Sequence, residues 1–256
     1  MANLTVDFVT LVLFCVAIGY FLWNLSKGKV TTLRAFPAID AISEGADRAL
    51  ETGKMVHYEP GAVCELSGQY ATMLLASLDI MRHVVRECIR KGAKFQITTP
   101  PRGDVVPLIH AIVQEVAVSE GKPEAYVRDN IRYYATGEAM TTGVIGRFYR
   151  EGVACHINIG CPGGYELNLM EHARYQGAMT IGGTPRWNIV YFFGMVSDYV
   201  LIGDEMYAAA AKVGENKFMI ATLGASDWMK VGIIALTLVG TILTAVGLPF
   251  TAWLGL

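Results

Sequence analysis

The sequence predicts an α/β fold: a doubly wound, mostly parallel, six-stranded Rossmann-like sheet, flanked by one N-terminal and one C-terminal transmembrane helix. Two observations support this prediction. Strand-like and helix-like segments alternate six times across residues 55–214, at a pitch of roughly 25–40 residues, which is typical of a parallel sheet covered by helices on both faces. In addition, both ends of the 256-residue chain are long apolar stretches, as expected for membrane spans.

The clearest strand–helix–strand unit lies at Val153–Thr184. It opens with Val153–Ile159, which is short and rich in β-branched residues, as buried strands are. A helix is expected over about Tyr165–Gln176, and a second buried strand at Ala178–Ile181. Such a unit implies parallel strands and a right-handed crossover. Its two glycine-rich turns follow the strands, where ligands of parallel sheets bind.

The remaining strands and helices follow from shorter patterns. Apolar runs bounded by glycine, proline or polar residues predict strands at Met55–Tyr58, Lys94–Thr98, Ile131–Ala135 and Tyr199–Ile202. Helical periodicity predicts helices over about Gln69–Lys91, from Asp104 onward, from Thr136 to about Arg150, and from Gly203 to Gly214. Asp104 is the expected N-cap of the second of these helices, and Gly92 the left-handed cap of the first.

The N-terminal apolar segment, Val6–Trp23, is about 18 residues long, enough to cross a bilayer. A secretory signal peptide is the alternative, but it would need a basic region before the apolar segment. Here Asp7 lies at that end, and the basic residues Lys27, Lys29 and Arg34 follow the segment. By the positive-inside rule, the N-terminus is expected outside and the central domain in the cytoplasm.

The C-terminal segment, Val231–Leu256, carries no charged residue, and Val231–Leu248 alone is about 18 residues long. Trp228 and Lys230 precede it as expected interfacial anchors. A second span that begins in the cytoplasm ends outside. Both termini of a two-pass protein in the cell membrane are therefore expected outside.

Five regions follow from these patterns. They are an N-terminal anchor at 1–26, a connector with an amphipathic helix at 27–54, the Rossmann-like domain at 55–214, a juxtamembrane linker at 215–230 and the C-terminal transmembrane segment at 231–256. The amphipathic helix has Pro37 in its first turn and ends at Gly53. It is expected either to lie on the membrane surface or to pack on the domain.

Composition narrows the class of protein. Hydrophobic residues make up 53% of the chain and charged residues 17%, below the roughly 25% charged residues of soluble domains. The formal net charge of −2 gives no basic footprint for nucleic acid. The five cysteines are scattered without a CxxC pair, so neither a zinc ribbon nor a disulfide framework is indicated.

Several short segments occur in an order that resembles a known family. They are Pro37–Ala41, Val56–Gly61, Ile181–Thr184, Leu201–Ala209 and Asp227–Lys230. The chain is similar to a domain-of-unknown-function family of prokaryotic membrane proteins with a Rossmann-like cytoplasmic region. The resemblance implies the same architecture and a prokaryotic source. It implies no activity, so it transfers no catalytic residue.

The glycine-rich turns do not match the known phosphate-binding motifs. No Gly-Lys-Ser/Thr ending of a Walker loop occurs, and Gly160–Gly164 is out of register with the dinucleotide fingerprint. Pro162 removes one amide that a phosphate would use. Acidic residues at the helix starts, such as Glu138 and Glu166, occupy the place of an anion, and most are explained as caps. A conventional nucleotide site is therefore not favoured.

Cys161 is the sharpest candidate for a reactive side chain. It lies between a buried strand and a helix, whose N-terminus can lower a thiol pKa. A nucleophile also needs a base, and the sequence does not place His156 or His172 beside the sulfur. The alternative is a small apolar residue in a tight turn. The remaining histidines show no ligand spacing and predict no metal site: His57, His83 and His110.

If the domain binds a ligand, the residues expected around it lie at the strand ends. They are Thr98, Arg102, Gly137, Gly160, Cys161, Gly163, Gly164, Gly182, Gly183 and Thr184. The sequence names no reaction, cofactor or substrate for this set.

Small residues, such as Ala208–Ala211, permit close helix packing and self-association. The leading functional prediction is therefore a structural or scaffold subunit of a homo-oligomeric assembly in the lipid bilayer, with a ring as the natural closed form. The alternative is a membrane-anchored domain that binds a small molecule or nucleotide, or an enzyme, with its site at the glycine-rich strand ends.

Overall fold

The computed structural model describes residues 4–27 and 34–246. The chain divides into two units, which are described separately below. One is the α/β domain, Arg34–Gly214, and the other is a helical unit from the two ends of the chain.

The α/β domain contains a six-stranded sheet in which each pair of neighbouring strands is parallel, which confirms the predicted architecture. The strand order is β3-β2-β1-β4-β5-β6. The strands are β1 (Met55–Glu59), β2 (Lys94–Thr98), β3 (Ile131–Arg132), β4 (Val153–Ile159), β5 (Met179–Thr184) and β6 (Tyr199–Ile202). At the edge, β3 is shorter than predicted, because only Ile131 and Arg132 pair with β2.

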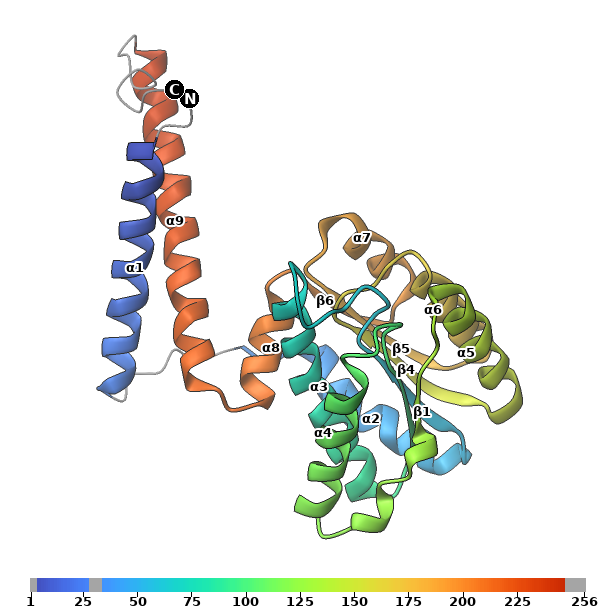
Figure 1. The fold of residues 1–256 in the computed structure, drawn as a ribbon. Helices are drawn as coiled ribbons and strands as arrows, with labels where there is room; N and C mark the ends of the chain where they lie inside the picture. The colour runs from blue at the N-terminus through green and yellow to red at the C-terminus, as the bar shows by residue number, and fades with distance from the viewer. Residues whose placement is uncertain (1–3, 28–33, 247–256) are drawn as a thin grey trace. The chain divides into compact units, whose positions relative to one another are not determined.

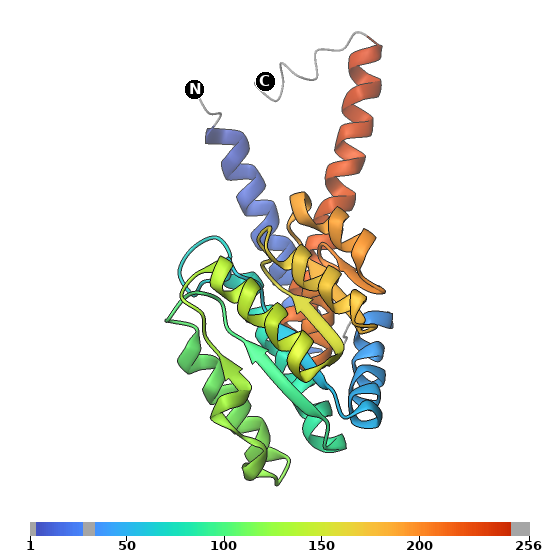
Figure 2. The ribbon, with the colours of Figure 1, turned by 90° about the vertical axis from the view of Figure 1, so that its right-hand side faces the viewer.

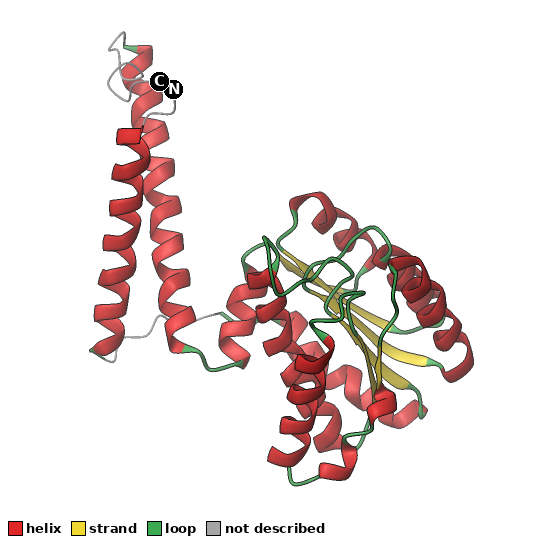
Figure 3. Cartoon of the chain, viewed as in Figure 1, coloured by secondary structure: helices red, strands yellow, loops and turns green. Residues whose placement is uncertain are grey.

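Helices cover both faces of this sheet (Figures 1 and 3). One face carries α2 (Pro37–Thr52), α3 (Ala71–Lys91), α4 (Val106–Ser119) and α8 (Glu205–Val213). The other carries α5 (Gly137–Glu151), α6 (Glu166–Tyr175) and α7 (Trp187–Val196), and in Figure 2 helices α5 and α6 lie in front of the strands. Two short 3₁₀ helices, Pro123–Ala125 and Arg128–Asn130, connect α4 to β3.

Hydrophobic spacing explains how two of these helices pack. In α3 the side chains of Leu74, Leu78, Met81 and Val85 recur at helical spacing and are buried. Each such side chain contributes roughly 1.5–3 kcal/mol by leaving water. Helix α2 buries its apolar face against β1 and β4, so it packs on the domain, the second of the two predicted alternatives.

Two local predictions were wrong or incomplete. Asp104 is not the N-cap of α4; Val105 is, and the Asp104 carboxylate accepts a hydrogen bond from the Leu66 amide at 3.4 Å instead. Helix α7 was not predicted, because its sequence is apolar almost throughout and shows no alternation of polar and apolar faces. The Thr136 hydroxyl does cap α5, by accepting from the Ala139 amide at 3.2 Å.

The strand order reverses between β1 and β4, which places the topological switch point of the sheet there. The register pairs His57 with His156 and Glu59 with Asn158 across these two strands. Their carboxyl ends are the expected ligand site of a sheet with this order.

The helical unit consists of α1 (Leu4–Ser26) and α9 (Lys217–Ala245), which lie side by side (Figure 1). Gly224 permits the contact, because a Cβ there would lie 2.7 Å from the Phe21 ring. Helix α9 begins at Lys217, so most of the predicted linker 215–230 is helical and continuous with the apolar segment.

Among the described residues, α9 is the helix that is long and apolar enough to cross a membrane, judged by length and composition. The apolar stretch of α1, Leu11–Ser26, is shorter, so a second span is not shown. The last part of the predicted C-terminal segment, residues 247–256, lies outside the described residues, as does 28–33 of the predicted connector.

Candidate functional site

Polar side chains lie on the sheet face that α5 and α6 cover, where a parallel sheet normally carries apolar ones. One row crosses four neighbouring strands in register: Gln96, His57, His156 and Thr180. All four side chains are buried. With its amide oxygen turned toward α5, Gln96 accepts a hydrogen bond from the Arg147 guanidinium at 2.6 Å.

His57 and His156 form a hydrogen-bonded pair in the centre of this row. Their Nδ1 atoms are 2.9 Å apart, and His57 Nε2 lies 2.8 Å from the Thr98 hydroxyl. The Phe148 ring packs on both imidazoles in T-shaped arrangements, with its centroid 5.1 Å from that of His57 and 5.3 Å from that of His156. Because one Nδ1 must donate and the other accept, the tautomers of the two rings are coupled.

Burial makes both histidines neutral at physiological pH. It lowers the pKa of His57 well below its usual value, with further lowering by His156 and by the positive charge of Arg147. It also lowers the pKa of His156 to about 3. The pair is therefore an uncharged, hydrogen-bonded element of the core.

A second polar pair lies one step further toward the carboxyl ends of the strands. Glu59 and Asn158 are register partners and both are 0% exposed. None of their four side-chain oxygen and nitrogen atoms has a hydrogen-bond partner among the described residues. Burial raises the pKa of Glu59 well above its usual value, and the neighbouring Glu166 carboxylate raises it further.

Glu166, the first residue of α6, brings a second buried carboxyl group to the same place. Its Oε1 accepts a hydrogen bond from the Ala62 amide at 2.5 Å. Its Oε2 has no hydrogen-bond partner within the described part of the chain. Burial raises the pKa of Glu166 as well.

The loops that follow β1 and β4 are joined directly above this cluster. The Cys161 amide donates to the Pro60 carbonyl at 2.8 Å, and the Val63 amide donates to the Cys161 carbonyl at 3.2 Å. Gly61 has φ +101°, and a Cβ there would lie 2.4 Å from the Cys161 carbonyl carbon. Close backbone contact, with no room for a side chain, therefore closes the switch point.

Three of the predicted ligand-site residues lie at this place. Thr98 bonds His57, and the Thr184 hydroxyl donates to the Gly160 carbonyl at 2.9 Å. Gly160 has φ +146°, and a Cβ there would lie 2.2 Å from the Pro60 carbonyl oxygen. Glycine is therefore needed at position 160, because a side chain there would prevent this close contact between the two loops.

The glycines of β5 and of the first turn of α5 serve packing. A Cβ at Gly182 would lie 2.6 Å from the Ser197 hydroxyl, and one at Gly183 would lie 3.1 Å from the Leu201 side chain. A Cβ at Gly137 would lie 2.6 Å from the ring of Tyr165.

The remaining predicted residues lie in the loops. Gly163 lies beside Glu166, since a Cβ there would be 3.4 Å from Oε2. Gly164 borders open space within the described residues. Arg102 is largely exposed, and its guanidinium lies 3.7 Å from the Glu65 carboxylate, away from the buried cluster.

The Cys161 thiol is buried and lies 3.7 Å from the Tyr70 carbonyl oxygen. Among the described residues neither candidate base is hydrogen-bonded to the thiol. His156 bonds His57 through Nδ1, and His172 Nδ1 lies 3.2 Å from the Tyr149 hydroxyl. This geometry favours the interpretation of Cys161 as a turn residue.

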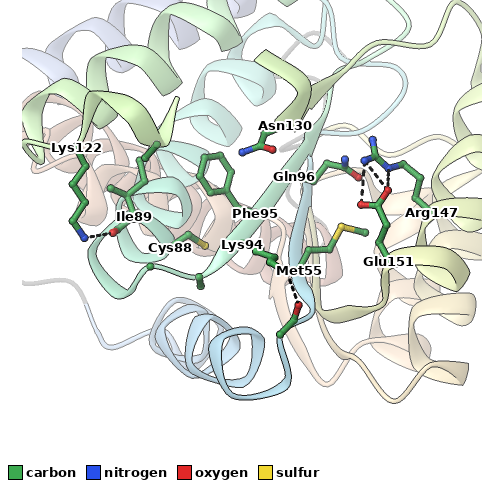
Figure 4. Close-up of a pocket in the computed structure, with 14 residues that line it drawn as sticks. Met55, Cys88, Ile89, Lys94, Phe95, Gln96, Lys122, Asn130, Arg147 and Glu151 are labelled. Atoms are coloured by element: carbon green, nitrogen blue, oxygen red, sulfur yellow. Dashed lines mark hydrogen bonds and ion pairs between the residues drawn. The ribbon is translucent and has the colours of Figure 1, made fainter. Parts of the chain in front are cut away.

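A cavity of about 520 Å³ lies at the opposite edge of the sheet, next to the amino ends of β1 and β2 (Figure 4). Its charged side chains already have partners. Arg147 binds Glu151 at 3.0 and 3.1 Å, and Lys122 donates to the Ile89 carbonyl at 2.7 Å. The carbonyls at the end of α3 also give this edge a partial negative charge, which Lys122 caps.

The residues of the buried cluster that the sequence prediction missed carried a recognisable signal. His57 and Glu59 alternate with apolar residues in β1, and His156 and Asn158 do the same in β4. A histidine followed two residues later by Glu or Asn, within a strand otherwise read as buried, is the pattern that marks the polar face.

The fold and this cluster define the chain as a Rossmann-like α/β protein with a buried polar site at the switch point of its sheet. The chain belongs to the family described as Domain of unknown function (DUF6754), whose model matches residues 1–253. This confirms the resemblance to an uncharacterised family, while its membrane-bound and prokaryotic character stay predictions. No curated protein and no solved structure matches the chain.

Proposed function

We propose that this chain is a two-pass membrane protein whose α/β domain binds a small molecule at the carboxyl ends of β1 and β4. One observation carries the proposal. Glu59 and Asn158, buried side by side at the switch point, have no hydrogen-bond partner among the described residues.

The free-energy cost of this arrangement is the reason to expect a ligand. A buried polar group without a partner costs about 1–3 kcal/mol, and a charged one costs more. The free energy of unfolding of a protein is only about 5–15 kcal/mol, so a cluster of such groups would remove a large part of the stability of a purely structural core. A ligand that supplies the missing hydrogen bonds removes this cost in the bound state.

The helical unit supports the membrane part of the proposal. Its apolar side chains, such as Leu238 on α9 and Val16 on α1, are mostly exposed to the surroundings of the chain. A bilayer would cover such a surface, and the basic residues after α1 favour a cytoplasmic position of the domain by the positive-inside rule.

The test uses the full chain purified in detergent. Thermal unfolding and native mass spectrometry are recorded with a panel of amines, polyols, nucleosides and divalent cations. At least one compound should raise the melting temperature of the wild-type protein, and the double variant Glu59→Met/Asn158→Leu should not respond to it. The matched control is Glu138→Met, which removes an exposed carboxylate at the same edge of the sheet. A wild-type protein that responds to no compound contradicts the proposal.

A second candidate function is that of a scaffold subunit that forms a homo-oligomer. It is favoured by α7, whose outer face exposes Trp187 (77%), Tyr191 (70%) and Met195 (75%). Exposed apolar patches of this kind often mark interaction surfaces. Mass photometry of the detergent-solubilised protein should show an oligomer that the variant Tyr191→Glu dissociates, whereas Val118→Glu, on the exposed side of α4, should not. A monomeric wild-type protein at micromolar concentration would exclude this function.

A further inference from the structure

We infer that the ligand of the switch-point site is a small organic cation, with a primary ammonium or guanidinium group held between Glu59 and Glu166. This inference rests on the proposed function and specifies the chemical class of its ligand.

The first argument is the inventory of polar atoms that lack partners in the described residues. Four oxygens accept hydrogen bonds: both of Glu59, Oε2 of Glu166 and Oδ1 of Asn158. Asn158 also presents its amide nitrogen as a donor, and His156 Nε2, on the same face of β4, has no partner either; the other unpartnered atoms of the described residues belong to Thr99, Arg132 and Ser197. An ammonium group offers three donors and a guanidinium up to five, and neither offers an acceptor, so each can satisfy the four oxygens of Glu59, Glu166 and Asn158.

The second argument is charge. The carboxyl groups of Glu59 and Glu166 are both fully buried, and Glu166 raises the pKa of Glu59 beyond the effect of burial. Arg186 is the cation that lowers the pKa of Glu166. Its guanidinium, however, donates to the Pro162 carbonyl and lies over the Tyr70 ring at 5.0 Å. Burial favours the protonated form of Glu59 when no ligand is bound, and a positive ligand group would favour its ionised form by pairing with it.

Other ligand classes fit the site less well. The Glu166 carboxylate occupies the start of α6 and binds the Ala62 amide, which takes the position that a phosphate would need. No group of three or more His, Cys, Asp or Glu side chains in the described residues is arranged to hold a metal ion. A neutral polyol would supply hydrogen-bond donors but no charge to pair with an ionised Glu59 or Glu166.

The site is closed, since Glu59 and Asn158 are 0% exposed. Entry therefore requires the loops after β1 and β4 to separate, which breaks the hydrogen bonds between Pro60, Val63 and Cys161. Closure excludes water and strengthens the interaction of a bound cation with the carboxylates. These features favour a small ligand over an extended one.

The experiment measures the affinity of the detergent-solubilised full chain for agmatine, putrescine, ribose, glycerol and Mg²⁺ by isothermal titration calorimetry. The amines should bind the wild-type protein. Glu59→Gln, which keeps the shape and removes the charge, should weaken amine binding at least about tenfold, because it removes one partner of a buried charge pair. Glu138→Gln is the matched control and should bind as the wild type does.

Asn158→Asp provides a second test that does not depend on the folding of Glu59→Gln. It adds a carboxylate of the same shape and should strengthen amine binding. Binding of polyols or Mg²⁺ but not amines would overturn the cationic class and leave the proposed function standing. Equal binding of amines by Glu59→Gln and the wild type would overturn the assignment of the cationic group to Glu59. No binding by any probe would overturn the proposed function itself.

Discussion

Replacing Glu59 by methionine should raise the free energy of unfolding of the α/β domain in the absence of ligand, although the side chain is fully buried. The carboxyl group of Glu59 has no hydrogen-bond partner among the described residues and lies near the carboxyl group of Glu166. Methionine has a similar length and volume, so it fills the same space without a cavity. The substitution removes the unmet polar group and keeps the packing.

The size of the gain follows from the structure. Relief of an unpartnered buried polar group is worth about 1–3 kcal/mol. Because a domain of this size shifts its melting temperature by roughly 2–4 °C per kcal/mol, the expected rise is about 2–12 °C. The gain should also depend on pH, because burial raises the pKa of Glu59 above 4.5 in the folded state.

The pH dependence has a definite sign. Between pH 4.5 and the higher folded pKa, the unfolded chain loses the Glu59 proton while the folded domain keeps it. The wild-type protein therefore loses up to about 1.4 kcal/mol of stability per pH unit through this group as the pH rises. Since methionine does not titrate, the advantage of Glu59→Met should grow as the pH rises above 4.5 toward the folded pKa of Glu59.

Differential scanning calorimetry of the full chain in detergent at pH 5.0, 6.5 and 8.0 measures these differences. Glu138→Met, which removes an exposed carboxylate that accepts a hydrogen bond from the Tyr165 hydroxyl, should not raise the melting temperature. A lower melting temperature of Glu59→Met at all three pH values would refute the reasoning. It would mean that Glu59 is fully hydrogen-bonded in the protein without a ligand.

Three further predictions concern the loop contact, the histidine pair and the membrane span. Gly61→Ala should destabilise the domain by about 3 kcal/mol or more, measured by thermal unfolding, because its Cβ would lie 2.4 Å from backbone; Gly92→Ala, with positive φ but open space, should cost about 1–2 kcal/mol. Equal losses would contradict the close contact. The wild-type domain should lose stability as the pH falls below 6.5, because histidines in the unfolded chain bind protons whereas the buried His57 and His156 stay neutral. The variant His57→Gln/His156→Gln should lose less stability than the wild type between pH 7.5 and 5.0. An equal loss of stability in both proteins would contradict this explanation. Leu238→Lys should reduce the carbonate-resistant membrane fraction, since a lysine at mid-span costs about 2.5–3.5 kcal/mol; an unchanged fraction would argue against α9 as a span.

Local patterns predicted much of the fold. The strands β2, β4 and β6 have the predicted bounds. Glycines at helix ends were reliable signals, because Gly53 and Gly92 adopt the left-handed conformation that other residues rarely enter. The prediction failed for α7, where no polar face distinguishes a helix from a strand.

The candidate site was predicted only in part. Gly160 and Thr184 were predicted from the glycine-rich turns that follow buried strands. Such turns can be recognised from the sequence, because the need for positive φ or close backbone approach is a local property. Glu59 and Asn158 were missed, because they are 99 residues apart and meet only through the register of β1 and β4. Similarly, the sequence did not indicate that Arg102 pairs with Glu65 on the exterior of the domain.

The sequence by itself determined the alternation of strands and helices, the parallel sheet and the apolar ends of the chain, because these depend on periodicity and on residue conformations within short segments. Only the tertiary structure decided which polar side chains share a buried face and which lack partners there. Strand order and register bring Glu59 beside Asn158, and the start of α6 brings Glu166 to both. The free-energy cost that points to a ligand arises from this burial and is absent from the extended chain.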